Sequence, residues 1–216
     1  MHRSPRRRLV VLITTLVCAI AGVQAANPTA NTARDTTASM LIDGAHKLPP
    51  APAGFAWKVV PMIALAFLVP DSWHLKEETN ELVRIWSITK DEFNAEGTFQ
   101  TGATILAFRL RDEDAARFAR QRIDHLLKLG PTRKAEGPWL RDDAKLIAYE
   151  LFLEAHYPYQ DASVRDKYVY NKALVNKATN ALYFVVFESP INTWAREWPI
   201  GEQMMRIMPL DMEPER

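Results

Sequence analysis

Cysteine is almost absent from this chain. The one cysteine in 216 residues, Cys18, lies in an apolar run near the N-terminus. If that run is removed after export, the remaining chain has no thiol. It can then form neither a disulfide nor a cysteine metal site. The folded part must then be stabilised by its hydrophobic core, and about 190 residues are ample for one core.

Long apolar runs are also scarce. The run from Leu9 to Val23 is shorter than the roughly 20 residues that cross a bilayer. Four arginines precede it, and Val23-Gln24-Ala25 ends it with small residues at an A-x-A-like cleavage site. This pattern predicts a secretory signal peptide over residues 1–25, with an uncleaved N-terminal anchor as the alternative. After cleavage we expect no membrane span and a periplasmic or secreted product.

An excess of basic residues is missing as well. The whole chain carries a formal charge of +1. Cleavage after Ala25 removes four arginines and no acidic residue, which leaves −3. A domain that binds phosphate backbones needs a net basic face, so nucleic acid is not expected as a partner.

Motifs for catalysis and for cofactor binding are lacking. Gly97 and Gly102 have phosphate-loop spacing, but Ala103-Thr104 stands where the lysine is required. No G-x-S-x-G motif marks a nucleophilic serine. Glu150 and Glu154 share one face of a predicted strand, about 13 Å apart, which is too far to share a proton. We therefore expect no catalytic residue and no cofactor, and an enzyme stays open only as the least favoured functional hypothesis.

The histidines do not form a metal-binding motif. His46, His74, His125 and His156 are far apart and include no H-x-x-x-H pair. A set of His74, His156 and Asp161 converging in space remains an open alternative. Scattered surface histidines are the simpler interpretation, so no metal site is predicted.

Composition divides the rest of the chain into three parts. Residues 26–54 are rich in Ala, Thr and Pro and predict a flexible linker that ends in Pro49-Pro50-Ala51-Pro52, with Met40–Ile42 as a patch that could dock on the domain. Residues 55–211 predict the folded domain. Residues 212–216 form a polar tail.

Alternating or doubly apolar runs predict strands. They cover residues 57–60, 63–69, 73–76, 83–89, 98–110, 139–155, 168–174 and 181–187. A helix is the alternative for 139–155, because Ala, Leu and Glu also favour helices. The last two runs are joined by the short polar segment Lys177–Asn180 and predict a hairpin.

Two helices are predicted. One follows Asp112 as its cap and ends at Gly130-Pro131, with an apolar stripe from Ala116 to Leu127. The other starts with Ser189 as cap and Pro190 at its first position, and Pro199 should kink or end it. Few helices between blocks of strands predict an α+β fold with a mostly antiparallel sheet sandwiched between helices.

Several short motifs, in order and spacing, resemble the PsbP-like family. They are Val69–Trp73, Ile88–Asp91, Gly97–Gly102, Thr179–Tyr183, Phe187–Pro190, Trp194, Trp198 and Gly201-Glu202. The resemblance covers roughly residues 57 to 211. It implies an antiparallel sheet between helices, a fold shared with a Ran-binding nuclear import factor. It also implies a binding or assembly protein, since members of the family include extrinsic subunits of the photosynthetic oxygen-evolving complex.

Aromatic and methionine residues near the C-terminus suggest where a partner binds. Methionine side chains repack around irregular partners, and tryptophan offers a large apolar surface. The candidate binding face consists of Trp194, Trp198, Met204, Met205 and Met208. Core filling is the alternative for most of the tryptophans.

The first functional hypothesis is an exported, non-catalytic PsbP-like module that docks on an envelope protein or complex. The second is a carrier that holds a small apolar ligand between the sheet and the C-terminal helix. The two hypotheses differ in the cavity that they require: a carrier needs an apolar one.

Overall fold

The computed structural model describes residues 48–79, 83–93, 99–108, 110, 114–128, 132–156 and 166–209. The predicted signal peptide, the Met40–Ile42 patch and the polar tail lie outside these residues. In the described part of the chain, neither helix has the length and apolar character needed to cross a bilayer.

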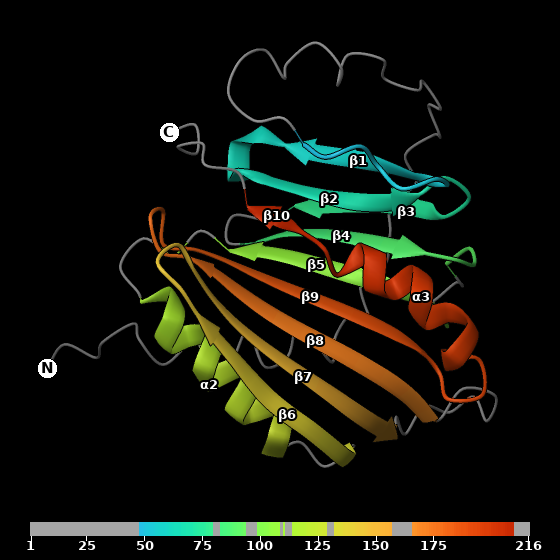
Figure 1. Ribbon diagram of the computed structural model, residues 1–216. Helices are drawn as coiled ribbons and strands as arrows, with labels where there is room; N and C mark the ends of the chain where they lie inside the picture. Colours follow the sequence, from blue (N-terminus) through green and yellow to red (C-terminus); the bar gives the residue numbers. More distant parts are fainter. Residues whose placement is uncertain are drawn as a thin grey trace, which may run out of the picture.

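A seven-stranded sheet forms the centre of the molecule (Figure 1). In chain order its strands are β3 (His74–Thr79), β4 (Val83–Thr89), β5 (Gly102–Phe108), β6 (Thr132–Asp142), β7 (Leu146–His156), β8 (Asp166–Asn176) and β9 (Ala181–Pro190). Their spatial order is β3-β4-β5-β9-β8-β7-β6, and each pair of neighbours is antiparallel. The predicted strand at 139–155 is in fact two, because β6 and β7 form a hairpin across residues 143–145.

A second, three-stranded sheet covers part of the first. It has the order β1 (Phe55–Val60), β2 (Leu65–Pro70) and β10 (Met208–Pro209). A short 3-10 turn, η2 (Pro61–Ile63), joins β1 to β2. The two sheets meet through Phe67 and Trp86, whose ring centroids are 5.6 Å apart. The Tyr183 hydroxyl adds a buried hydrogen bond of 2.6 Å to the Ile63 carbonyl.

Helix α2 (Ala115–Lys128) lies on the opposite face of the large sheet, across β6 to β9 (Figure 1). Its buried side chains are Ala115, Ala119 and Ile123. Ala119 and Ile123 belong to the predicted apolar stripe, whereas Ala115 is buried in place of Ala116 and Leu127 is exposed. The predicted cap, Asp112, lies outside the described residues. The Asp114 carboxylate accepts bonds from the Ala116 and Arg117 amides and caps the helix.

Helix α3 (Trp194–Met204) lies on the same side as the small sheet. The prediction that Ser189 caps it was wrong, because β9 pairs with β8 as far as Pro190 and keeps both residues extended. Thr193 occupies the N-cap position instead. The helix also continues through Pro199 rather than ending there.

The predicted fold class, a mostly antiparallel α+β sheet with helices on both faces, is confirmed. One addition is the three-stranded sheet, which lies beside α3 on the same face of the large sheet. The end of the predicted linker lies on this small sheet: Trp57 Nε1 donates a 2.8 Å bond to the Pro49 carbonyl, and Leu48 packs against the buried Ala64 and Ala66.

Candidate binding groove beside α3

The face of the large sheet that carries α3 is covered unequally. Over β4, β5 and β9 the small sheet and α3 bury Trp86, Ile105 and Val185 completely or nearly so. Beyond β9 the face continues across β8, β7 and β6, and α3 packs chiefly on β2, β5 and β9. Most of the side chains that β7 and β8 present there remain half-exposed.

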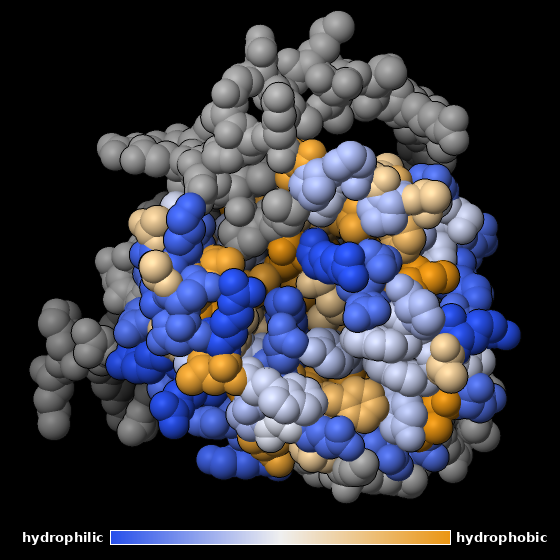
Figure 2. Space-filling view, in the orientation of Figure 1, coloured by the Kyte–Doolittle hydropathy of each residue, from blue (hydrophilic) through white to orange (hydrophobic). Residues whose placement is uncertain are grey.

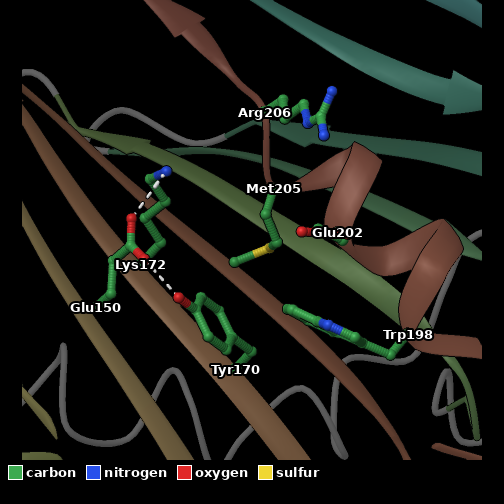
Figure 3. Close-up of a pocket in the computed structure, with 7 residues that line it drawn as sticks. All are labelled: Glu150, Tyr170, Lys172, Trp198, Glu202, Met205 and Arg206. Carbon is green, nitrogen blue, oxygen red and sulfur yellow. Dashed lines mark hydrogen bonds and ion pairs between the residues drawn. The ribbon is translucent and has the colours of Figure 1, made fainter. Parts of the chain in front are cut away.

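We call this strip the groove. Strand register places Trp139 of β6, Glu150 and Phe152 of β7, and Tyr170 and Lys172 of β8 side by side on its floor. A shallow cavity of about 190 Å³ lies where the floor meets α3 (Figure 3). Its lining comprises Glu150, Tyr170, Lys172, Trp198, Glu202, Met205 and Arg206.

A second cavity of about 100 Å³ adjoins the first, since Glu150 and Lys172 line both. Its other walls are the apolar side chains of Leu146, Leu174 and Ile207, with Ala148 and Arg141. Figure 2 shows the same face of the molecule: hydrophilic residues and residues of intermediate or high hydropathy are interspersed across it.

The floor of the groove carries one polar network. Lys172 Nζ lies 3.0 Å from Glu150 Oε1, and the Tyr170 hydroxyl donates a hydrogen bond to Glu150 Oε2 (Figure 3). Burial opposes ionisation of Glu150, but the Tyr170 hydrogen bond and the Lys172 charge outweigh it and hold the pKa of Glu150 below its ordinary value. Burial and the Glu150 contact raise the pKa of Tyr170. At neutral pH the network is an ion pair with a neutral phenol.

The α3 side of the groove is a stack of aromatic rings. Trp194 and Trp198 lie nearly parallel with centroids 4.9 Å apart, and Tyr170 sits 4.9 Å from Trp198. Because the two tryptophans are four residues apart on one helix, they lie on the same face. Phe187 of β9 contacts both from below.

Two contacts hold α3 in place. Glu197 is 1 % exposed and accepts bonds from Lys90 Nζ at 2.7 Å and from Arg196 Nε at 2.8 Å. Burial opposes its ionisation, but these two cations keep the pKa of Glu197 below its ordinary value. Gly201 lets the helix approach the sheet, since a Cβ there would lie 2.6 Å from the Phe187 ring.

The β6 side of the groove is formed by a bulge. The pairing of β6 with β7 shifts between Glu136 and Trp139, and Gly137 has a φ of +103°. A Cβ at Gly137 would lie 2.8 Å from the Glu150 carbonyl oxygen and 3.2 Å from the Trp139 ring, so glycine is required here. The bulge leaves the Trp139 side chain 50 % exposed.

The structure divides the predicted binding face. Trp194 and Trp198 are half-buried and border the groove. Met204 and Met205 are 1 % and 5 % exposed and belong to the core, so they do not form an open surface, although Met205 reaches the wall of the cavity. Met208 is placed in β10, and its side chain lies outside the described residues.

The structure also bears on the alternative that His74 and His156 converge on a metal ion. His74 is in β3 and His156 in β7, and four strands lie between these two in the large sheet. Strands that far apart, roughly 24 Å at ordinary spacing, cannot share an ion. Among the described residues no group of three potential ligands is close enough to hold a metal.

Sequence reasoning missed Trp139, Tyr170 and Lys172 as groove residues. The alternation in β8 indicated that Tyr170 and Lys172 share a face, but not which face stays open. The signal for Trp139 was the Gly137-Pro138 pair before it, which is typical of a bulge or turn.

No protein-family model matches this sequence, and a comparison with curated proteins finds no match. Solved structures that are similar include a cyanobacterial PsbP from Synechocystis sp. PCC 6803, with 10 % identity, 74 % of this chain and 94 % of that chain covered, and a TM-score of 0.47. For the Ran-binding protein Mog1p of Saccharomyces cerevisiae the identity is 12 %, the match covers 73 % of this chain and 97 % of Mog1p, and the TM-score is 0.42. PA94 of Pseudomonas aeruginosa is a protein of unknown function described as a putative regulator. Its sequence identity to this chain is 13 %, the match covers 75 % of this chain and 98 % of PA94, and the TM-score is 0.40.

Both kinds of protein named by the sequence resemblance are thus among the structures to which this chain is similar. At these identities and TM-scores the likeness carries no argument about activity or partners.

Proposed function

We propose that this chain is exported and acts as a non-catalytic binding module of the cell envelope, with the groove as its docking surface. The observation that supports this most is the unequal cover of one sheet face. Half of that face is sealed, whereas the other half leaves Trp139, Tyr170 and Trp198 in contact with solvent around a polar network. Aromatic rings that reach the surface, as Trp139 does and as Tyr170 and Trp198 do in part, are enriched at binding sites.

The polar network is not arranged as a catalytic group. Glu150 is satisfied by Lys172 and Tyr170, and its pKa is lowered rather than raised toward neutrality. A general acid or base at neutral pH needs the opposite shift. The geometry therefore supports recognition, and the partner that we expect is a protein or another macromolecule of the envelope.

The apolar-carrier hypothesis receives less support. The larger cavity lies between the sheet and α3, as that hypothesis requires, but two carboxylates and two cations line it. Burying an apolar ligand against these groups would desolvate them without new hydrogen bonds, which is unfavourable.

The export step rests on the N-terminal sequence alone. It predicts a processed chain that begins at Ala26 and is recovered from the envelope fraction of the source cell. N-terminal sequencing tests this directly, and a chain that keeps Met1 and stays in the cell interior contradicts it.

Site-specific cross-linking tests the docking surface. A photo-reactive phenylalanine analogue is placed at Trp139 and, as the matched control, at Leu75, which is 40 % exposed on β3 at the other edge of the sheet. We expect a discrete cross-linked product in the envelope fraction from position 139 only. Equal products from both positions, or none from 139, would contradict the groove as docking surface.

A further inference from the structure

We infer that the groove binds a neutral glycan chain built from N-acetylated hexosamines. This inference rests on the proposed docking surface and names the class of its partner. It depends on four properties of the groove: an exposed ring, a balanced set of charges in the larger cavity, a length greater than one sugar, and a small side cavity with one apolar wall.

The exposed ring is Trp139. Among the large apolar side chains exposed in the described residues, Trp139 is the one aromatic, and the others are Met62, Leu75, Leu127 and Leu140. A Cβ at position 137 would lie 3.2 Å from this ring, so the ring passes close to the glycine of the bulge at the rim of the groove. Pyranose rings present flat patches of C–H groups, and these stack on the electron-rich face of an indole.

The charges of the larger cavity balance. Glu150 and Glu202 supply two carboxylates, and Lys172 and Arg206 supply two cations. Such a site gives no net attraction to an anion or a cation, so electrostatics do not favour a charged partner. It does offer donors and acceptors in mixture, which suits hydroxyl groups because each hydroxyl is both donor and acceptor.

The length of the groove exceeds a single sugar. From Trp139 on β6 to Tyr170 and Lys172 on β8 the distance is two strand spacings, roughly 10 Å. Trp198 and Glu202 extend the surface further onto α3 (Figure 3). The larger cavity, about 190 Å³, is smaller than the sites that enclose whole ligands, roughly 300 Å³ and above. A chain that lies across the surface fits this shape better than an engulfed monosaccharide.

The side cavity specifies the substituent. Leu146, Leu174 and Ile207 form its apolar wall, and Arg141, Glu150 and Lys172 form its charged wall, so its volume of about 100 Å³ suits a small group that is part apolar and part polar. The methyl of an acetamido group can lie against the apolar wall, while the acetamido N–H and C=O can bond to Glu150 and Lys172, which lie at the junction of the two cavities. A plain hydroxyl at that carbon leaves the cavity unfilled.

Calorimetric titration of the processed chain with chitotetraose and with cellotetraose tests the inference. We expect binding of chitotetraose and at least about tenfold weaker binding of cellotetraose, since one acetyl methyl and its hydrogen bonds are worth about 1.4 kcal/mol. Trp139→Ala should weaken chitotetraose binding about tenfold, the value of one stacked ring. Leu140→Ala, on the same strand and 60 % exposed, is the matched control and should change it less than about twofold.

An NMR titration gives an independent readout. The indole Nε1–H signal that disappears in Trp139→Ala should shift on addition of chitotetraose. Absence of both heat and shift overturns the glycan assignment, and equal affinity for the two sugars overturns the role of the side cavity. If the position-139 cross-link then proves to be a protease-sensitive protein adduct, the docking surface stands and the glycan does not; if there is no cross-link either, both proposals fail.

Discussion

Two halves of one sheet face differ in what lies above them. Over β4, β5 and β9 the face meets the three-stranded sheet and α3, and Trp86, Phe67 and Phe187 are wholly buried. Over β6 to β8 the same face presents a partly buried glutamate, lysine and tyrosine joined by polar contacts. We expect the first half to contribute more to stability, and we propose the second as the binding surface. This separation predicts that substitutions in the two halves will have unlike effects.

The largest effect on stability is expected from Trp86→Ala. Trp86 is 0 % exposed and packs on Phe67 between the two sheets. Truncating a buried aromatic costs roughly 3–5 kcal/mol, and urea unfolding followed by tryptophan fluorescence and circular dichroism measures it. A loss below about 1 kcal/mol, the typical effect of an average substitution, would show that the closed half is not the source of stability.

Glu197→Gln should have the next largest effect, about 2 kcal/mol, because it removes the charge of a buried carboxylate that accepts hydrogen bonds from Lys90, directly after β4, and from Arg196 within α3. The lowered pKa of Glu197 also gives a pH signature. Its stabilising contribution is present above the unfolded carboxyl pKa of about 4.3 and is lost as pH falls through the lower folded pKa. Unfolding free energies measured from pH 7 to pH 3 should therefore converge for the two proteins, and parallel curves would contradict this role.

Tyr170→Phe lies in the open half and should destabilise the protein by only about 1 kcal/mol, the value of one partly exposed hydrogen bond. The informative measurement is the carboxyl titration of Glu150 by NMR. Removing the hydroxyl that favours the ionised form should raise the pKa of Glu150. An unchanged pKa would mean that Lys172 alone sets it.

Trp139→Ala should be nearly neutral for stability, within about 0.5 kcal/mol, because the side chain is half-exposed on an edge strand. Thermal unfolding of this variant beside Leu140→Ala gives the comparison. A loss as large as that of Trp86→Ala would remove the distinction between the two halves, whereas a neutral result together with weakened glycan binding would sharpen it.

The sequence predicted the sheet better than it predicted the surface. β4 was expected at its observed bounds, and the β8–β9 hairpin was found with its turn at Lys177–Asn180, because alternation and turn residues are local signals. β6 was missed as a separate strand because its bulge at Gly137 breaks the alternation. Met204 and Met205 were expected on a binding face, but the path of α3 turns them into the core.

The groove itself could not have been predicted from spacing. Trp139, Glu150 and Lys172 become neighbours through the register of β6, β7 and β8, which depends on long-range pairing. Whether that face stays open depends on where α3 packs, and this is decided by the distant contact of Glu197 with Lys90 and by the fit of Gly201 against Phe187. Such contacts leave no periodic trace in the chain.

The pairing of β10 with β2 has a consequence for how the polypeptide acquires its shape. Met208 lies opposite Ala66, so one of the last residues described completes a sheet begun by some of the first. Likewise β5 pairs with β9, which lies more than 70 residues later in the chain. Contacts between segments so remote in sequence form slowly, and neither sheet can be finished until nearly all of the polypeptide has been synthesised. For the export that we propose, this late completion of both sheets would delay stable folding until the chain has passed a narrow export channel.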